Sequence, residues 1–128
     1  AFLLRIQSST NAPWLLVSDD EADQTFEDSS NVRCEQAPDL TPNQWHHLAG
    51  QYDRSARTLR LWVDGTKQCE LTTTGGDGLL DQRTTEVSLG VWRAPSTDVF
   101  FQGIIDEMRV YDRALNEDEI LRDLNGDL

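Results

Sequence analysis

Short runs of alternating hydrophobic and polar residues, separated by turn-forming residues, recur along most of this chain. Runs of this kind, about four to eight residues long and bounded by Gly, Pro, Asn, Asp or Ser, predict β-strands. The predicted strands are Ala1 to Gln7, Trp14 to Val17, Ser30 to Gln36, Trp45 to Tyr52, Leu59 to Val63, Lys67 to Leu71, Glu86 to Val91 and Gly103 to Tyr111. So many short strands indicate an all-β fold, an antiparallel β-sandwich of the jelly-roll kind.

The most specific local signal is the dipeptide Asp64-Gly65, which lies between two of these runs. Asp-Gly flanked by alternating hydrophobic residues predicts a two-residue β-hairpin, because both residues adopt positive φ at little cost. We assign Asp64 no role beyond this turn.

The end of the chain has a helical pattern instead. Asn116 followed three residues later by Glu119 predicts a capped helix start, and Asn125-Gly126 predicts the helix end. The apolar residues between them share one helical face: Ile120, Leu121 and Leu124. The chain is therefore predicted to be mostly strands, with one short C-terminal helix.

The length of 128 residues suits one domain, spanning 1–128, with a single hydrophobic core. No run of about 18 apolar residues occurs, so we expect no membrane insertion. No signal peptide is recognisable in this sequence, and we expect any export signal to lie outside it.

The charge balance is strongly acidic, with 23 Asp and Glu against 11 Lys and Arg and a net charge of -12. This charge repels polyanions, so nucleic acid and anionic membrane surfaces are excluded as partners. Six acidic residues lie between Asp19 and Asp28. We interpret that run as a solvated loop, with a weak cation site as the alternative.

The two cysteines, Cys34 and Cys69, match neither a CxxC motif nor a zinc-binding pattern. Each lies in a predicted strand between polar neighbours. Half-exposed thiols would be a liability in the cytosol, so we predict a Cys34–Cys69 disulfide and an oxidising compartment. The protein is thus expected to be secreted or at the cell surface, in an extracellular or periplasmic location.

Two stretches of the sequence carry a family resemblance. The first runs from Trp45-His46-His47-Leu48-Ala49 to Leu61-Trp62-Val63-Asp64-Gly65, and the second from Phe101-Gln102-Gly103-Ile104-Ile105-Asp106-Glu107 through Tyr111 to Arg113-Ala114-Leu115. In this order they resemble the signature of laminin-G-like jelly-roll domains of the concanavalin A-like lectin/glucanase superfamily. The resemblance covers residues 45–124 well and residues 1–44 only loosely.

Members of that family begin with a strand carrying a Phe-Asp-Gly-type motif, which we do not recognise here. The chain is therefore expected to start partway through the domain. The N-terminal portion is lost, lies on another chain, or has diverged.

Asp106 is a carboxylate within an otherwise apolar predicted strand, where an unpaired charge would be costly. Three kinds of partner are open: Arg109 or Arg113, backbone N–H groups, or a calcium ion. In jelly rolls that this sequence resembles, an Asp at this place helps to bind a structural calcium. The resemblance therefore nominates Asp106 as a metal ligand, with calcium as the one expected cofactor.

The aromatic residues of the signature have a structural interpretation. Trp45 and Trp62 are predicted to pack in the core, because large aromatics of alternating strands usually face inward. His46 and His47 point in opposite directions along a strand. We expect one of them to be half-buried with a satisfied partner and the other to be solvated.

We predict a non-catalytic binding or adhesion module that recognises a carbohydrate or glycoprotein. The candidate ligand-binding residues are Trp92, Arg93 and Asp98, in one predicted loop. A tryptophan can stack on a sugar ring, and Arg and Asp can bond its hydroxyls. The alternative for Trp92 is that it covers the edge of the sandwich.

A glycoside hydrolase of the same fold would need two carboxylates about 5–5.5 Å apart for retaining hydrolysis. Asp106 and Glu107 are adjacent, so they point to opposite faces of a strand. We therefore predict no catalytic residue and no enzyme activity.

A third role is that of a structural subunit in a larger secreted or cell-surface assembly. The apolar run Gly103 to Tyr111 should be paired on both sides, because an open edge invites aggregation. The pairing strand would come from another polypeptide, an upstream fragment, or Ala1 to Gln7.

Overall fold

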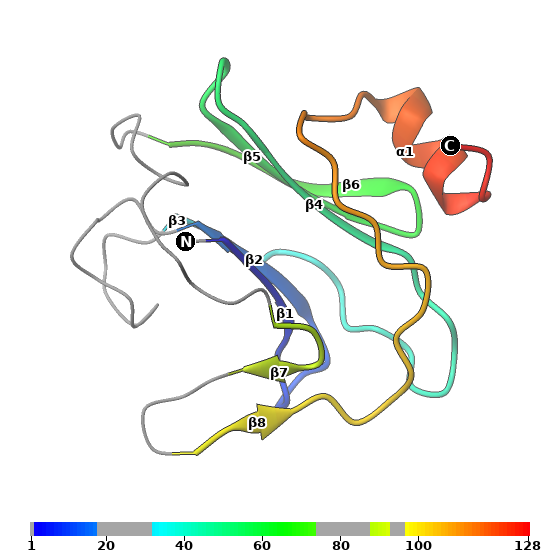
Figure 1. The fold of residues 1–128 in the computed structure, drawn as a ribbon. Helices are drawn as coiled ribbons and strands as arrows, with labels where there is room; N and C mark the ends of the chain where they lie inside the picture. Colours follow the sequence, from blue (N-terminus) through cyan, green and yellow to red (C-terminus); the bar gives the residue numbers. More distant parts are fainter. Residues whose placement is uncertain (1, 18–31, 74–87, 93–96) are drawn as a thin grey trace.

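The structure is a computed structural model that describes residues 2–17, 32–73, 88–92 and 97–128, with only the backbone of Phe2 and Trp92 (Figure 1). Its elements are β1 (Phe2–Ile6), β2 (Pro13–Val17), β3 (Val32–Cys34), β4 (Leu48–Asp53), β5 (Thr58–Val63), β6 (Thr66–Thr72), β7 (Val91–Trp92), β8 (Val99–Phe100) and α1 (Glu117–Leu124). The acidic run between Asp19 and Asp28 lies outside the described residues.

Two three-stranded antiparallel sheets form the body of the molecule, in the orders β1-β2-β3 and β4-β5-β6. The hairpin between β5 and β6 turns at Asp64-Gly65, where both residues have positive φ, 50° and 75°, as the dipeptide predicts. Strands β7 and β8 form a separate two-stranded ribbon. The predicted mostly-β sandwich with one short C-terminal helix is confirmed.

The core lies between the inner faces of the two sheets. Alternate residues of each strand point inward, because side chains along a strand switch faces with a period of two. The buried members come from both sheets: Leu15, Val17 and Cys34 from the first, and Leu59, Leu61, Val63 and Cys69 from the second. Burying these apolar side chains is the main force that holds the sheets together.

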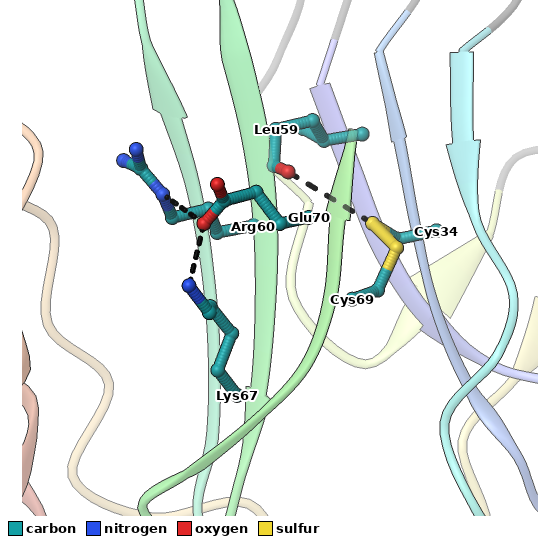
Figure 2. The surroundings of a disulfide bond; sticks show 6 residues. All are labelled: Cys34, Leu59, Arg60, Lys67, Cys69 and Glu70. Atoms are coloured by element: carbon teal, nitrogen blue, oxygen red, sulfur yellow. Dashed lines mark hydrogen bonds and ion pairs between the residues drawn. A yellow bond between two sulfur atoms is a disulfide. The ribbon is translucent and has the colours of Figure 1, made fainter. Parts of the chain in front are cut away.

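The predicted disulfide is confirmed. Cys34 in β3 and Cys69 in β6 are joined by an S–S bond of 2.04 Å across the two sheets (Figure 2). In Figure 2 the next residue, Glu70, points away from the sulfurs towards Arg60 and Lys67. Its carboxylate accepts hydrogen bonds from Arg60 Nε at 2.9 Å and Lys67 Nζ at 2.6 Å. These two cations, Lys67 first, lower the pKa of Glu70.

The outer face of the β4–β6 sheet is covered by α1 and the residues just before it (Figure 1). Trp62 packs there against Leu115 and Ile120, so it is buried as predicted, although beneath the helix rather than between the sheets. Glycine suits position 65 because its φ of 75° would be strained for other residues; a Cβ atom there would also lie 2.8 Å from Leu121 Cδ2.

The predicted start of the helix is also confirmed. The Asn116 side chain accepts a hydrogen bond from the backbone N–H of Glu119, and the Glu119 carboxylate accepts one from the backbone N–H of Asn116. This reciprocal capping box satisfies backbone donors that have no partner within the helix. Arg113 binds the same carboxylate at 2.7 Å and 2.8 Å. Arg113 and the Asn116 N–H together lower the pKa of Glu119 to about 2.

The predicted strand from Gly103 to Tyr111 is wrong. This part of the chain has no regular secondary structure, and every residue from Val99 to Arg113 is exposed. A β-strand exists only where a neighbouring strand supplies hydrogen bonds, and Ala1 to Gln7 does not do so here. That segment contains β1, which pairs with β2 from Phe2↔Val17 to Ile6↔Pro13.

Two further predictions need correction. Trp45 is 69% exposed instead of buried, because it lies in the irregular approach to β4, outside both sheets. Of the strand predicted over Glu86 to Val91, Val91 lies in β7 and Ser88–Gly90 form no ladder, while residues 86 and 87 lie outside the described residues.

Candidate binding surface

The loop predicted to bind a ligand begins at Trp92, the last residue of β7, and its last residue, Asp98, directly precedes β8. Trp92 pairs with Val99 across the β7–β8 ribbon, so its backbone lies beside that of Asp98. The Trp92 side chain and the whole of Arg93 lie outside the described residues, and Asp98 is partly exposed. The ligand-binding role of these three residues stays a prediction.

The exposed segment, residues 99–113, holds eight of the thirteen large hydrophobic residues that are exposed in the described part of the chain. They are Val99, Phe100, Phe101, Ile104, Ile105, Met108, Val110 and Tyr111. Scattered single hydrophobic residues are normal on a protein surface, whereas exposed apolar residues that gather in one place mark an interaction site. The exposed segment is therefore a candidate binding surface in its own right.

Backbone groups of the exposed segment form few hydrogen bonds with the other described residues. The Phe101 N–H donates to the Gly90 carbonyl at 2.9 Å, next to the ribbon. Beyond it, within the described ranges, residues 102–113 make no backbone–backbone hydrogen bond. The Glu107 N–H donates instead to the side chain of Asp106. Buried or not, the other backbone N–H and C=O groups require partners, which water or another backbone can supply.

The C-terminal part of the exposed segment is fastened to α1 by Asp123. Arg109 donates to Asp123 Oδ1 at 2.7 Å, and the Tyr111 hydroxyl donates to the same oxygen at 2.8 Å. The other oxygen, Oδ2, lies 3.1 Å from His47 Nε2, just before β4. One carboxylate thus joins the helix, the exposed segment and the β4–β6 sheet.

This carboxylate remains ionised over a wide pH range. Burial alone would raise the pKa of Asp123, but hydrogen bonds from Arg109, Tyr111 and His47 outweigh it and lower the pKa. The same contact with Asp123 raises the pKa of the Tyr111 hydroxyl, which keeps it protonated as a donor. Charge-assisted hydrogen bonds of this kind are stronger than neutral ones.

His46 makes a second histidine–carboxylate pair. Its Nδ1 lies 2.8 Å from Asp64 Oδ2, and this hydrogen bond raises the pKa of His46. Asp64 Oδ1 accepts the backbone N–H of His47 at 2.9 Å. Burial opposes these bonds, yet the pKa of Asp64 is lowered overall. The Asp64 carboxylate therefore does more than support the turn, which corrects the sequence-based assignment.

The expectation of one solvated histidine is wrong as well. Both rings are largely covered and each contacts a carboxylate, His46 that of Asp64 and His47 that of Asp123. The sequence does not indicate the His47–Asp123 pair, because these two residues are 76 positions apart. No local motif signals such a contact.

Asp106 is exposed instead of buried in a strand, so the cost of an unpaired buried charge does not arise. Its Oδ1 accepts the backbone N–H of Glu107 at 2.9 Å, one of the three kinds of partner left open by the sequence. Arg109 and Arg113 bind other carboxylates.

The described residues hold no group of three or more His, Cys, Asp or Glu side chains that could bind a metal. A calcium ion at Asp106 would therefore need backbone carbonyls and water for most of its oxygen ligands. Calcium binding there stays a prediction.

Among the residues that the structure describes, no helix is long and apolar enough to cross a lipid bilayer.

Comparisons with known proteins address the fold and the family. The family described as the Concanavalin A-like lectin/glucanases superfamily matches residues 1–121. The chain is also similar to the crystal structure of an S-layer domain-containing protein (residues 221–444) from Clostridium thermocellum ATCC 27405, with a TM-score of 0.58 and 18% identity. The match covers 95% of this chain and 61% of that one, and at this identity it supports the fold alone. No curated protein matches the chain.

Proposed function

Since the chain belongs to the Concanavalin A-like lectin/glucanases superfamily, we propose that it is a non-catalytic extracellular binding module for a carbohydrate or glycoprotein. The observation that carries this proposal is the exposure of an aromatic side chain, Trp45, beside β4. An indole ring held in solvent offers a flat apolar face on which a sugar ring can stack. Fold alone does not fix function, so the argument depends on the side chains presented.

The surroundings of Trp45 favour a pre-organised surface. The next residue, His46, is held by Asp64 on one ring nitrogen and by the Thr41 carbonyl, 3.1 Å away, on the other. Rigid neighbours reduce the entropy that is lost on binding. Trp92, Arg93 and Asp98 are a second proposed set of contact residues for the same kind of ligand, although Arg93 lies outside the described residues.

Two observations support the absence of catalysis. The Glu107 carboxylate is paired with Arg109 at 3.1 Å, and Asp106 is exposed to solvent. An acid for glycoside hydrolysis typically lies in an apolar pocket. Both of these carboxyls are exposed instead.

An extracellular or cell-surface location is part of the proposal. The Cys34–Cys69 disulfide supports it, since such bonds persist in oxidising compartments. The similarity in fold to a protein described as S-layer domain-containing is compatible with the same location. We also propose a structural calcium ion at Asp106. It would be detected as a dependence of the unfolding of the chain on calcium.

Replacing Trp45 with alanine is expected to weaken glycan binding by about tenfold, the loss of one good aromatic contact. The purified chain would be screened against immobilised mannan, β-glucan, chitin oligosaccharides and peptidoglycan fragments, and the best ligand titrated calorimetrically. Trp92→Ala and Asp98→Ala test the ribbon in the same assay. Leu89→Ala is the matched control, because Leu89 is also exposed. Retention of none of these glycans, or equal affinity of the Trp45→Ala and unmodified chains, contradicts the proposal.

The exposed segment favours a second role, that of a structural subunit in a larger secreted or cell-surface assembly. Its apolar side chains lie in solvent over fifteen consecutive residues, from Val99 to Arg113. Exposure on this scale is costly to solubility unless the surface is covered in the assembled state.

In material secreted by the native host, residues 99–113 are expected to be protected from carbene footprinting several-fold more than in the purified chain. Mass spectrometry after labelling would measure the modification of each peptide. The exposed loop of residues 54–57 is the internal control and should be labelled equally in both samples. Equal labelling of residues 99–113 in both samples would exclude the assembly role.

A further inference from the structure

The loop that carries the exposed Trp45, residues 41–46, is fixed at both ends. Just before it, Leu40 packs against the core, and its N–H donates to a backbone carbonyl at 3.1 Å. Just after it, the His47 N–H donates to Asp64 Oδ1 at 2.9 Å. The first five residues of the loop are all exposed. The position of Trp45 therefore depends on what holds the loop itself.

The His46 ring closes this loop. Its Nε2 lies 3.1 Å from the carbonyl oxygen of Thr41, the first residue of the loop, and its Nδ1 lies 2.8 Å from Asp64 Oδ2 in the β5–β6 turn. In the described part of the chain, no other hydrogen bond involves residues 41–45. One side chain therefore joins both ends of the loop and fastens them to the β5–β6 turn.

Both ring nitrogens of His46 face oxygen acceptors, one of a carboxylate and one of a backbone carbonyl. A neutral imidazole has one N–H and can donate to only one of them, whereas an imidazolium donates from both nitrogens. The geometry therefore fits the protonated ring. The hydrogen bond with Asp64 also raises the pKa of His46, with burial opposing this effect and the Thr41 carbonyl supporting it.

The charged groups around the ring favour the same state. Burial alone would raise the pKa of Asp64, but hydrogen bonds from His46 and from the His47 N–H outweigh it, so this carboxylate stays ionised. The His47 ring is directed to α1, where its Nε2 lies 3.1 Å from Asp123. Asp123 is bound in turn by two side chains of the exposed segment, Arg109 and Tyr111. The one carboxylate in contact with the His46 ring is therefore that of Asp64.

We propose that protonation of His46 regulates the Trp45 site, so that glycan binding tightens as the pH falls. The imidazolium closes the loop and holds Trp45 in one position, which reduces the motion lost when a sugar stacks on the indole. The neutral ring gives up one of its two bonds, and the loop is then held less firmly. This inference rests on the proposed glycan-binding function.

The direction of the pH dependence follows from the raised pKa of His46. A histidine has an ordinary pKa of about 6.5. The stabilisation of the loop is therefore complete below about pH 6.5 and is lost as the pH rises through the higher pKa of the folded state.

NMR spectroscopy tests the loop without a ligand. The His46 ring is expected to carry protons on both nitrogens at about pH 6 and to titrate above about pH 6.5. As the ring loses its proton, the amides of residues 43–45 should become more mobile on the nanosecond timescale. The exposed turn of residues 54–57 is the control and should not change.

The affinity for mannan, β-glucan and N-acetylated chitin oligosaccharides, which are neutral, would be measured at about pH 6 and about pH 9. We expect binding to be about fivefold weaker at the higher pH, the effect of one charge-assisted hydrogen bond on the loop. His46→Gln should bind at the weaker level at both pH values, because glutamine does not titrate. Asp64→Asn keeps a favoured Asn-Gly turn and should move the midpoint of the change to lower pH.

His47→Gln is the matched control and should keep the pH dependence, whatever its affinity. Titration of His46 at or below about pH 6.5, unchanged mobility of residues 43–45, or a pH dependence that persists in His46→Gln would overturn the proposal. The first two outcomes are measured on the unmodified chain and do not depend on how the variants fold. Equal affinity at both pH values would leave the binding function standing and refute its regulation. If none of the glycans binds although the ring and loop respond as expected, the binding function is wrong and the control of the loop by His46 stands.

Discussion

Reducing the Cys34–Cys69 disulfide is expected to lower the free energy of unfolding by about 4 kcal/mol. The bond closes a loop with a sequence separation of 35 residues, and the chain-entropy relation gives about 4 kcal/mol for a loop of this length. The loss is large for a small domain, whose total stability is about 5–15 kcal/mol. The bond also joins the two sheets directly, so reduction removes the only covalent cross-link between them.

Urea denaturation with and without dithiothreitol would measure this difference. The control is the Cys34→Ala/Cys69→Ala variant, which should be less stable and should not respond to the reductant. Both cysteines are buried, so the bond is expected to be reduced slowly in the folded state and rapidly once urea opens the sandwich. A disulfide usually contributes about 2–4 kcal/mol. The prediction would be refuted if the free energies of unfolding of the reduced and oxidised chains differed by less than about 1 kcal/mol, half of the lower value.

Replacing Leu61 with alanine is expected to cost about 3–5 kcal/mol. Leu61 lies at the centre of β5, is completely buried and belongs to the core shared by both sheets. Its truncation removes apolar burial and leaves a cavity, because flanking strands tied by ladder hydrogen bonds cannot collapse into it. The neighbouring disulfide further restricts relaxation at this place, since Leu61 pairs with Cys69 across the β5–β6 ladder.

Thermal and urea unfolding of the Leu61→Ala variant would give this cost. Leu89→Ala deletes the same atoms from a side chain that is 54% exposed and should change the stability by no more than about 0.5 kcal/mol. If both variants lose the same amount, the core does not lie between the two sheets as described.

The sequence predicts only part of the candidate surface. The sequence shows the apolar residues of Gly103 to Tyr111 but not which strand pairs with them. In the structure β1 pairs with β2, and no other described strand pairs with this segment. Trp45 was assigned to the core because an aromatic residue in a strand usually faces inward, but β4 begins three residues later.

Sequence alone determined the features that depend on neighbours along the chain. The Asp64-Gly65 hairpin follows from the φ preferences of two residues, and the start of α1 follows from the bonding of Asn116 and Glu119 three positions apart. The alternation of apolar residues identified most strands, because the two-residue period of a strand is a local property. The disulfide was predicted on the premise of half-exposed thiols; the bond is present, but both cysteines are buried, so the prediction was right and its premise was wrong.

Only the tertiary structure decided which distant groups meet. His47 and Asp123 are 76 residues apart, and no pattern in the sequence joins them; they meet because α1 folds back onto the outer face of the β4–β6 sheet. Whether Gly103 to Tyr111 is a strand likewise depends on a neighbour elsewhere in the chain. A strand is defined by its hydrogen-bonded partner, so an apolar extended run without one remains an exposed segment.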